Sequence, residues 1–180
     1  MSDSLETATL AGGCFWCVEA ALERLHGVES VTSGYAGGDV PDPTYEEVCT
    51  GETGHAEVVR IEFDSSELDF EELLAAFFTI HNPTTKDREG PDVGTQYRSA
   101  IFYESDTQRA TAEDLIKELE EEGVYDDPIV TEIEPLEEFW EAEEYHQDYY
   151  EKNPNQAYCS AYIPPKIEKL KERFAGKLRS

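Results

Sequence analysis

The chain has 180 residues and a formal net charge of −27 at neutral pH, from 41 acidic and 14 basic side chains. Such a charge excludes proteins that bind nucleic acid or anionic membrane surfaces, and no run of about 18 apolar residues is present to span a bilayer. The length suits one hydrophobic core, so we expect a single domain over residues 1–180.

The acidic residues are spread along the whole chain instead of forming a tail. This pattern is typical of a solvated acidic surface, and in a sharper form it indicates adaptation to a salt-rich cytoplasm where ions screen self-repulsion. Residues 1–7 have neither a basic segment nor a long apolar one, so we expect no signal peptide and a cytoplasmic location. A monomer is expected.

Strands and helices alternate in the first half of the chain. The predicted elements are a strand over 6–11, a helix over 14–26, a strand over 28–35, a strand over 55–64 and a helix over 70–80. Asp69 and Glu72 have the spacing of a capping box at the start of the last helix. Residues 36–44 are expected to form a loop because they contain several glycines and prolines.

The second half continues this alternation. The predicted elements are a loop over 84–94, a strand over 95–103, a helix over 105–122, a strand over 128–133, a helix over 136–152, a loop over 153–157 and a helix over 165–175. Ser105 and Gln108 are expected to form a capping box. The whole pattern favours an α/β or α+β two-layer sandwich of one sheet and several helices.

The motif Gly12-Gly13-Cys14-Phe15-Trp16-Cys17 lies where a strand passes into a helix. Unpaired amides at a helix N-terminus favour a thiolate, so Cys14 is a candidate nucleophile; the alternative is a small buried apolar residue. Phe15 fits the buried stripe of the helix, whereas Trp16 does not. A large aromatic side chain beside a reactive thiol is typical of a ligand-binding wall.

Cys14 and Cys17 also form a C-x-x-C pair, a spacing typical of thiol–disulfide exchange. Four cysteines in a cytosolic chain favour catalysis or metal binding over a disulfide framework. A structural zinc site needs four ligands, and the chain contains no second C-x-x-C pair and no two histidines at ligand spacing. We therefore expect no metal.

Glu57 is a candidate proton donor. In the alternating pattern of residues 55–64 it shares a face with Val59, Ile61 and Phe63. Burial on that face would raise the pKa of its carboxyl group and keep it protonated near neutral pH. The alternative is a glutamate at the end of a strand that reaches solvent.

Loops and their edges hold three further candidates, Tyr45, Asp92 and Tyr97, because binding groups tend to collect there. Tyrosine at the end of a strand is more often partly buried packing. His26, His81 and His146 are interpreted as structural residues.

The chain resembles the A-type peptide-methionine sulfoxide reductases, which act on the S epimer of the sulfoxide. The resemblance rests on motifs in family order over about 9–166: GGCFW (12–16), SGYAGG (33–38), PTYEEVC (43–49), TGHAEVV (53–59), DVGTQYRS (92–99) and AEEYHQ (142–147). It implies a ferredoxin-like plait with extra helices and long loops, and it implies no metal or organic cofactor.

The resemblance also implies a reaction, the repair of methionine-(S)-sulfoxide, free or in proteins. Cys14 would attack the sulfoxide sulfur and become a sulfenic acid, while protonated Glu57 would give a proton to the departing oxygen. Tyr45 and Tyr97 would hydrogen-bond that oxygen, and Asp92 would support the site.

Phe15 and Trp16 would form the pocket for the substrate methyl group. A second thiol would then form a disulfide with Cys14, and thioredoxin or a similar dithiol would reduce it. Many members of the family have glycine in place of Cys17 and use a C-terminal cysteine, and NPNQAYC (153–159) resembles the segment that carries it.

Cys159 is therefore the expected resolving thiol, on a loop that can move toward Cys14. Cys17 is the alternative, although a disulfide within the first turn is expected to be strained, and a relay through both thiols is a third route. Cys49 is assigned no redox role.

Two functions of other classes stay open from the residues alone. One is a general thiol–disulfide oxidoreductase that uses Cys14 and Cys17, which gives Glu57 no task. The other is a non-catalytic metal-binding or acidic interaction module.

Overall fold

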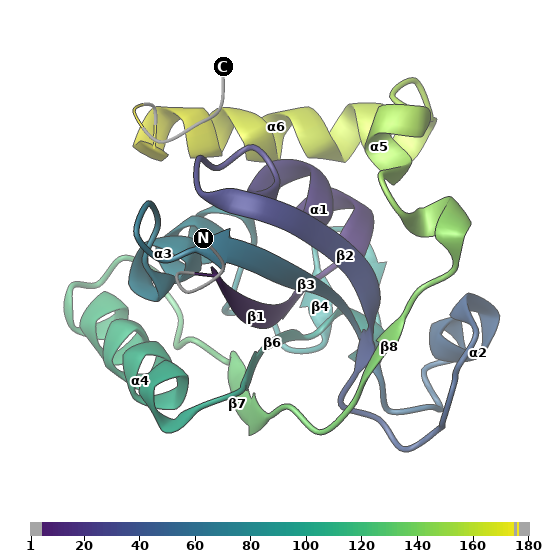
Figure 1. The fold of residues 1–180 in the computed structure, drawn as a ribbon, viewed down its shortest axis with the longest axis horizontal. Coiled ribbons are helices and arrows are strands. Elements are labelled where there is room, and N and C mark those ends of the chain that lie inside the picture. Colours follow the sequence, from purple (N-terminus) through teal and green to yellow (C-terminus); the bar gives the residue numbers. More distant parts are fainter. Residues whose placement is uncertain (1–4, 175, 177–180) are drawn as a thin grey trace.

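A six-stranded sheet forms the centre of the fold (Figure 1). In the computed structural model, which describes residues 5–174 and 176, its order is β7-β6-β1-β3-β2-β8. The strands are Leu5–Gly12 (β1), Val28–Ala36 (β2), Ala56–Asp64 (β3), Ser99–Tyr103 (β6), Glu132–Pro135 (β7) and Phe139–Glu141 (β8). All neighbours are antiparallel except the β6–β7 pair. A separate hairpin joins Arg88–Glu89 (β4) to Asp92–Val93 (β5).

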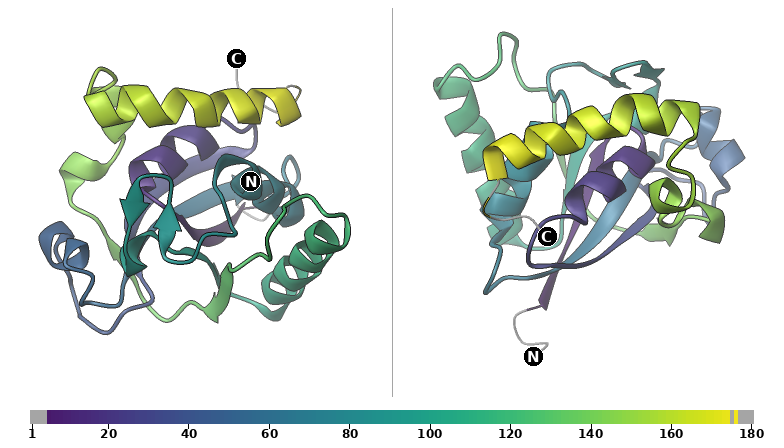
Figure 2. Two further views of the ribbon diagram at one scale, coloured as in Figure 1. Left: turned by 180° about the vertical axis from the view of Figure 1, so that it is seen from behind. Right: turned by 90° about the horizontal axis from the view of Figure 1, so that it is seen from above.

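The predicted ferredoxin-like plait is confirmed by the connections of the four central strands. The chain runs β1-α1-β2-β3-α3-β6, and these strands lie side by side in the order β6-β1-β3-β2. The helices of this unit are α1 (Phe15–Leu22) and α3 (Phe70–Ile80), and α6 (Ala157–Phe174) packs against both of them (Figure 2). A further helix, α4 (Asp106–Glu121), packs against α3 and the β6–β7 edge.

The period of β3 places Glu57 on the helix side of the sheet. Val59, Ile61 and Phe63 belong to the main hydrophobic core, whereas Val58 belongs to a smaller cluster that includes Phe139. Because side chains alternate along a strand, Glu57 shares the face of Val59. The predicted alternation of this strand is confirmed.

One predicted capping box is complete and the other forms in part. Asp69 and Glu72 exchange their side-chain and backbone hydrogen bonds at the start of α3, as predicted. At α4, Ser105 Oγ accepts from the Gln108 N–H at 3.2 Å. The Gln108 Oε1 atom, however, accepts from the N–H of Glu104 and not from that of Ser105.

A short helix, α2 (Tyr45–Cys49), was not predicted. Thr44 Oγ1 accepts from the Glu47 N–H at 3.1 Å, and Glu47 Oε1 accepts from the Thr44 N–H at 2.9 Å. This capping box fixes Tyr45 at the first position of the helix.

The predicted helix over 136–152 is wrong. This segment forms β8 at the edge of the sheet, a 3-10 turn over Glu144–His146 and the short helix α5 (Tyr149–Lys152). Gly34 of β2 lies opposite Glu141, and a Cβ atom on Gly34 would come within 2.5 Å of the Trp140 carbonyl oxygen. Pairing with β2 therefore replaces the helix that the local spacing favours.

Other boundaries also differ. The predicted strand over 95–103 begins at Ser99, after a 3-10 turn over Thr95–Tyr97, the strand over 128–133 lies at Glu132–Pro135, and the helix over 14–26 ends at Leu22. The last helix begins at Ala157 instead of residue 165, and predicted residue 175 lies outside the described residues. In the part of the chain that the structure describes, no helix is both long and apolar enough to cross a membrane.

Candidate active site

Cys14 connects β1 to α1 and is buried. It is the N-cap residue of α1, its carbonyl oxygen accepts from the Cys17 N–H at 3.1 Å, and its side chain is 8% exposed. The preceding Gly13 has a φ of +94°, and a Cβ atom there would lie 2.5 Å from Glu89 Cγ. Glycine therefore allows the β4–β5 hairpin to lie close to the turn that carries the thiol.

The helix N-terminus does not make Cys14 acidic, contrary to the prediction. Burial raises the pKa of its thiol well above the ordinary value, and a hydrogen bond with Cys17 and the charge of Glu57 act in the same direction. Cys17 is the more acidic partner, because its hydrogen bond with Cys14 lowers its pKa and the charge of Lys166 adds to this. Ionisation of Cys14 therefore depends on the groups around it.

Glu57 is a buried acid with one unused oxygen. Its side chain is 1% exposed, and Oε1 accepts from the Phe15 N–H at 3.0 Å. Oε2 is buried and has no hydrogen-bond partner in the described chain. Burial raises the pKa of the carboxyl group to about 8, although the bond from Phe15 opposes this. Glu57 therefore holds a proton at neutral pH. Its burial also excludes the alternative that this side chain reaches solvent from the end of the strand.

Two tyrosines lie near this carboxyl group. Burial raises the pKa of Tyr45, and the charge of Glu57 raises it further. Burial, and then the charge of Glu57, also raise the pKa of Tyr97. The charges of Asp92 and Cys14 raise the pKa of Tyr97 further. The structure therefore brings all five predicted catalytic residues into one site, and both phenols keep their protons.

Asp92 reaches the site from the β4–β5 hairpin. Its Oδ2 atom accepts a short hydrogen bond from the hydroxyl group of Tyr158. Tyr158 Oη also accepts from Cys17 Sγ at 3.7 Å. Tyr158 therefore connects Asp92 to the Cys17 thiol. The sequence analysis did not propose Tyr158 as a site residue.

The two predicted wall residues have different surroundings. Phe15 lies in the main core, with ring centroids 5.7 Å from Tyr35 and 6.2 Å from Tyr45. Trp16 is partly exposed and stacks on Tyr149, with centroids 3.8 Å apart and planes at 8°. This arrangement leaves an aromatic surface beside Cys14.

His146 completes the aromatic surface, although the sequence favoured a purely structural role. Its Nδ1 atom accepts from Trp16 Nε1 at 3.0 Å, and its ring lies 4.3 Å from that of Tyr45. The buried Nε2 atom has no partner in the described chain. His146 and Tyr149 were missed because their segment was interpreted as one helix; the signal was its concentration of aromatic residues.

Cys159 was predicted to lie on a loop, and this prediction is wrong. It lies in the first turn of α6. Its side chain is 0% exposed and clusters with Cys14 and Cys17. Burial raises the pKa of Cys159, and the charge of Cys17 raises it further. Cys17 thus interacts with both other thiols. Cys49 is exposed at the end of α2 and hydrogen-bonds with Tyr45.

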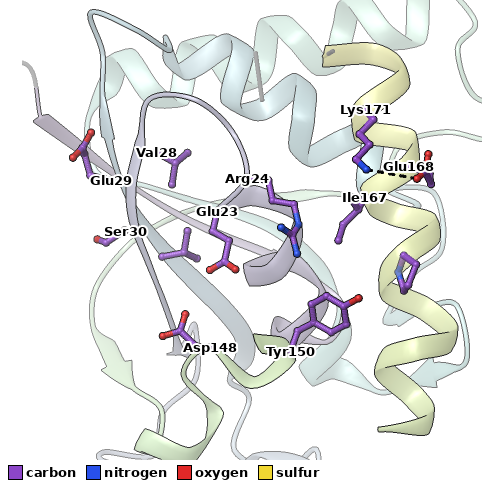
Figure 3. Close-up of a pocket in the computed structure, with 12 residues that line it drawn as sticks. Glu23, Arg24, Val28, Glu29, Ser30, Asp148, Tyr150, Ile167, Glu168 and Lys171 are labelled. Carbon is purple, nitrogen blue, oxygen red and sulfur yellow. Dashed lines mark ion pairs between the residues drawn. The ribbon is translucent and has the colours of Figure 1, made fainter. Parts of the chain in front are cut away.

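A groove beside α1 and α6 is lined by none of the four cysteines (Figure 3). It has a volume of about 890 Å³ and runs between the end of α1, the start of β2 and α6, lined by Glu23, Arg24, Glu168 and Lys171 among others. Near it, the carboxylates of Glu19, Glu23 and Asp148 lie within 4.8 Å of one another. None of the predicted catalytic residues belongs to this groove or to the acidic cluster.

Comparison with known sequences identifies one family. The family model described as peptide methionine sulfoxide reductase matches residues 6–178. The peptide methionine sulfoxide reductase MsrA of Natronomonas pharaonis is 63% identical over 97% of this chain and 98% of that protein. The MsrA of Sulfolobus acidocaldarius is 54% identical over 96% of this chain and 97% of that protein.

Solved structures agree with the sequence comparison. Reduced Mxr1 from Saccharomyces cerevisiae has a TM-score of 0.80 at 36% identity, over 90% of this chain and 93% of that chain. Methionine sulfoxide reductase A of Corynebacterium diphtheriae has a TM-score of 0.81 at 36% identity, over 85% of this chain and 77% of that chain. Mxr1 in complex with Trx2 has a TM-score of 0.57 at 27% identity, over 83% and 87% of the two chains. The chain belongs to the peptide methionine sulfoxide reductase family, in its A type.

Proposed function

We propose that this protein reduces methionine-(S)-sulfoxide, free or in proteins, to methionine with electrons from a dithiol. The observation that carries the proposal is the protonated, buried Glu57, which lies in the same site as the Cys14 thiol and whose Oε2 atom has no hydrogen-bond partner among the described residues. A nucleophilic sulfur and a proton donor are the two groups that removal of a sulfoxide oxygen requires.

In the proposed reaction the Cys14 sulfur attacks the sulfoxide sulfur while Glu57 protonates the oxygen. This attack forms a bond between Cys14 Sγ and the substrate sulfur. The protonated oxygen then passes to Cys14 Sγ as the sulfur–oxygen bond of the substrate and the new sulfur–sulfur bond both break, and methionine leaves. Cys14 is oxidised by two electrons to a sulfenic acid, the substrate sulfur is reduced by two, and the thiol proton restores Glu57.

Tyr45 and Tyr97 donate hydrogen bonds to the sulfoxide oxygen. Their raised pKa values support this role, because both phenols remain donors across the physiological pH range. Asp92 supports the site indirectly, through the hydroxyl group of Tyr158.

The substrate methyl group binds against Phe15 and Trp16. The stack of Trp16 on Tyr149 and its hydrogen bond to His146 support this assignment, since both fix the indole ring beside Cys14. An oxygen side formed by Glu57 and the tyrosines, and a methyl side formed by the aromatic rings, would select one epimer.

Cys17 is the first resolving thiol in this proposal, and Cys159 the second. The hydrogen bond between Cys14 and Cys17 supports this order. The Cys17 thiolate attacks the Cys14 sulfur, and the hydroxyl group leaves as water after taking a proton. Cys159 then attacks Cys17, which breaks the Cys14–Cys17 bond and frees Cys14 for another turnover.

The reductant is thioredoxin or a dithiol protein of similar chemistry. The complex of the relative Mxr1 with Trx2 supports this choice. Because Cys17 and Cys159 are buried, the start of α6 has to move before the reductant reaches their disulfide. Pro164 and Pro165, which lack a backbone N–H, interrupt the hydrogen bonding of α6 just after this segment.

We further propose a monomer that works in a salt-rich cytoplasm. The charge of −27 supports this setting, because only high salt screens so many like charges at short range.

Turnover of each epimer of a blocked methionine sulfoxide with dithiothreitol tests the function. We expect activity on the S epimer and none in Cys14→Ser. Activity on the R epimer alone, or activity that persists in Cys14→Ser, contradicts the proposal. Reduction of insulin disulfides without any sulfoxide reduction would favour a general thiol–disulfide oxidoreductase.

A further inference from the structure

Glu19 is a buried acid that the proposed chemistry does not use. It lies on α1, the helix that begins after Cys14, and is 2% exposed. Its two carboxylate oxygens lie 3.1 and 3.0 Å from the backbone nitrogen of Asp148, whose N–H donates to them. The N–H of Tyr149 also donates to this carboxyl group.

The backbone at Asp148 is shaped for this contact. Asp148 has a φ of +56°, which is in the left-handed region, and α5 begins at the next residue. The turn presents two successive N–H groups to Glu19. Without an acceptor these partly buried donors would lose their hydrogen bonds, because the first amides of a helix have no partner within the helix.

Helix α1, which carries Glu19, also holds the Tyr149 ring. Trp16 and Glu19 are three positions apart, so they lie on one face of α1. Trp16 stacks on the Tyr149 ring, while Glu19 binds the Tyr149 backbone. The side chain and the main chain of Tyr149 are thus both held by the same face of α1.

An apolar side chain would fill the position of Glu19 without the cost of burying a polar group. The acid is therefore better explained by what it binds than by packing. We propose that Glu19 is a positioning residue of the substrate pocket, which holds the backbone of residues 148–149 so that the Tyr149 ring lies against Trp16. This inference rests on the proposed function of the pocket.

The protonation state of Glu19 shapes the test. Burial raises the pKa of its carboxyl group to about 8, and the charges of Glu23 and Asp148 raise it further. A protonated carboxyl group still accepts through its carbonyl oxygen, and a glutamine side chain has the same shape and the same acceptor. Glu19→Gln should therefore keep the anchor, whereas Glu19→Leu should fill the space and lose it.

We expect Glu19→Leu to raise KM for the sulfoxide about tenfold, the effect of losing one or two net hydrogen bonds, with kcat within about twofold of wild type. Glu19→Gln should stay within about twofold of wild type in both constants. Glu23→Gln is the matched control, because it removes a neighbouring acid of the same cluster and leaves residues 148–149 and their hydrogen bonds to Glu19 in place; its KM should equal that of wild type.

A spectroscopic readout separates positioning from general damage. The chain has two tryptophans, so Trp140→Phe leaves Trp16 as the single emitter. In this background Glu19→Leu should change the Trp16 emission, and Glu19→Gln and Glu23→Gln should not. If Glu19→Leu does not fold, Glu19→Asp serves in its place, since it withdraws the acceptor by one methylene and should also raise KM.

A wild-type KM and unchanged Trp16 emission in Glu19→Leu would overturn the inference. So would a fall in kcat with KM unchanged, or a Glu19→Gln variant as impaired as Glu19→Leu. If the wild type itself reduces no sulfoxide, the proposed function fails, while the emission of Trp16 still tests the anchor alone.

Discussion

The backbone N–H of Phe15 donates to Glu57 Oε1 at 3.0 Å, across 42 positions of sequence. This bond joins the first turn of α1, where the nucleophile lies, to the central strand that carries the acid. Hydrogen bonding to a carboxylate favours its charged form, whereas burial favours its neutral form. Burial is the larger effect, so the pKa of Glu57 is about 8 and the acid stays protonated next to Cys14.

The first prediction concerns the pH dependence of the chemical step. Single-turnover formation of methionine should slow above about pH 8, as Glu57 loses its proton. Glu57→Gln keeps the bond from Phe15 but has no proton to give, so its rate should fall roughly 10²- to 10⁴-fold and lose this pH limb. Glu62→Gln, on the same strand, is the control. A Glu57→Gln rate within tenfold of wild type would show that another group supplies the proton.

The second prediction concerns stability. The pKa of Glu57 rises from 4.5 to about 8 in the folded protein, so the unfolded chain releases this proton more easily. Its contribution to stability is therefore complete below about pH 4.5 and is lost as the pH rises through about 8. Between pH 6 and 9 the free energy of unfolding should fall by roughly 2–3 kcal/mol more in wild type than in Glu57→Gln. Urea unfolding of both proteins at both pH values measures this, and parallel losses would contradict it.

Much of this site was predictable because local patterns determine where its residues lie. The alternation of β3 places Glu57 on the buried face, and the glycine-to-helix switch places Cys14 at the start of α1. Neither depends on distant parts of the chain. Tyr45 and Tyr97 were candidates because they were predicted in or beside loops, and their roles came from the family resemblance; their short helical turns were not predicted.

The errors arose where distant contacts override local pattern. The segment with His146 has helix-like spacing, but its structure depends on pairing with β2 and on Trp16, 130 positions away. Cys159 was placed on a loop because the last amphipathic helix was predicted to begin only at residue 165. In the structure α6 passes through Pro164 and Pro165, since its first turns pack on α1.

The third prediction concerns the order of the thiols. After one turnover without reductant, peptide mapping of wild type should find a Cys17–Cys159 disulfide and a free Cys14. Cys159→Ser should stop at a Cys14–Cys17 disulfide, because its relay lacks the last thiol. A wild-type Cys14–Cys159 disulfide, with recycling unaffected in Cys17→Ser, would instead support direct resolution by Cys159.

The fourth prediction concerns Tyr158, whose hydroxyl group donates to Asp92 and accepts from Cys17. Once Cys17 is ionised, its thiolate has no proton to donate and the Tyr158 hydroxyl group becomes the hydrogen-bond donor, which contributes to the lowered pKa of this thiol. Tyr158→Phe should therefore raise the pKa of Cys17 and slow disulfide formation, with less effect on the release of methionine. Alkylation rates of Cys17 against pH, in a Cys159→Ser background, measure the shift. An unchanged alkylation profile would remove Tyr158 from the activation of this thiol.

The last prediction concerns salt. A net charge of −27 on 180 residues destabilises the compact state by self-repulsion, and screening extends over only about 3 Å at 1 M salt, against about 10 Å at 0.1 M. The melting temperature should therefore rise with KCl concentration. Glu118, Glu121 and Glu122 are exposed at the C-terminal end of α4, where negative charge also opposes the helix dipole. Changing all three to glutamine should raise the low-salt melting temperature and flatten its dependence on salt. A wild-type melt as high in low salt as in high salt would show that the acidic surface needs no screening.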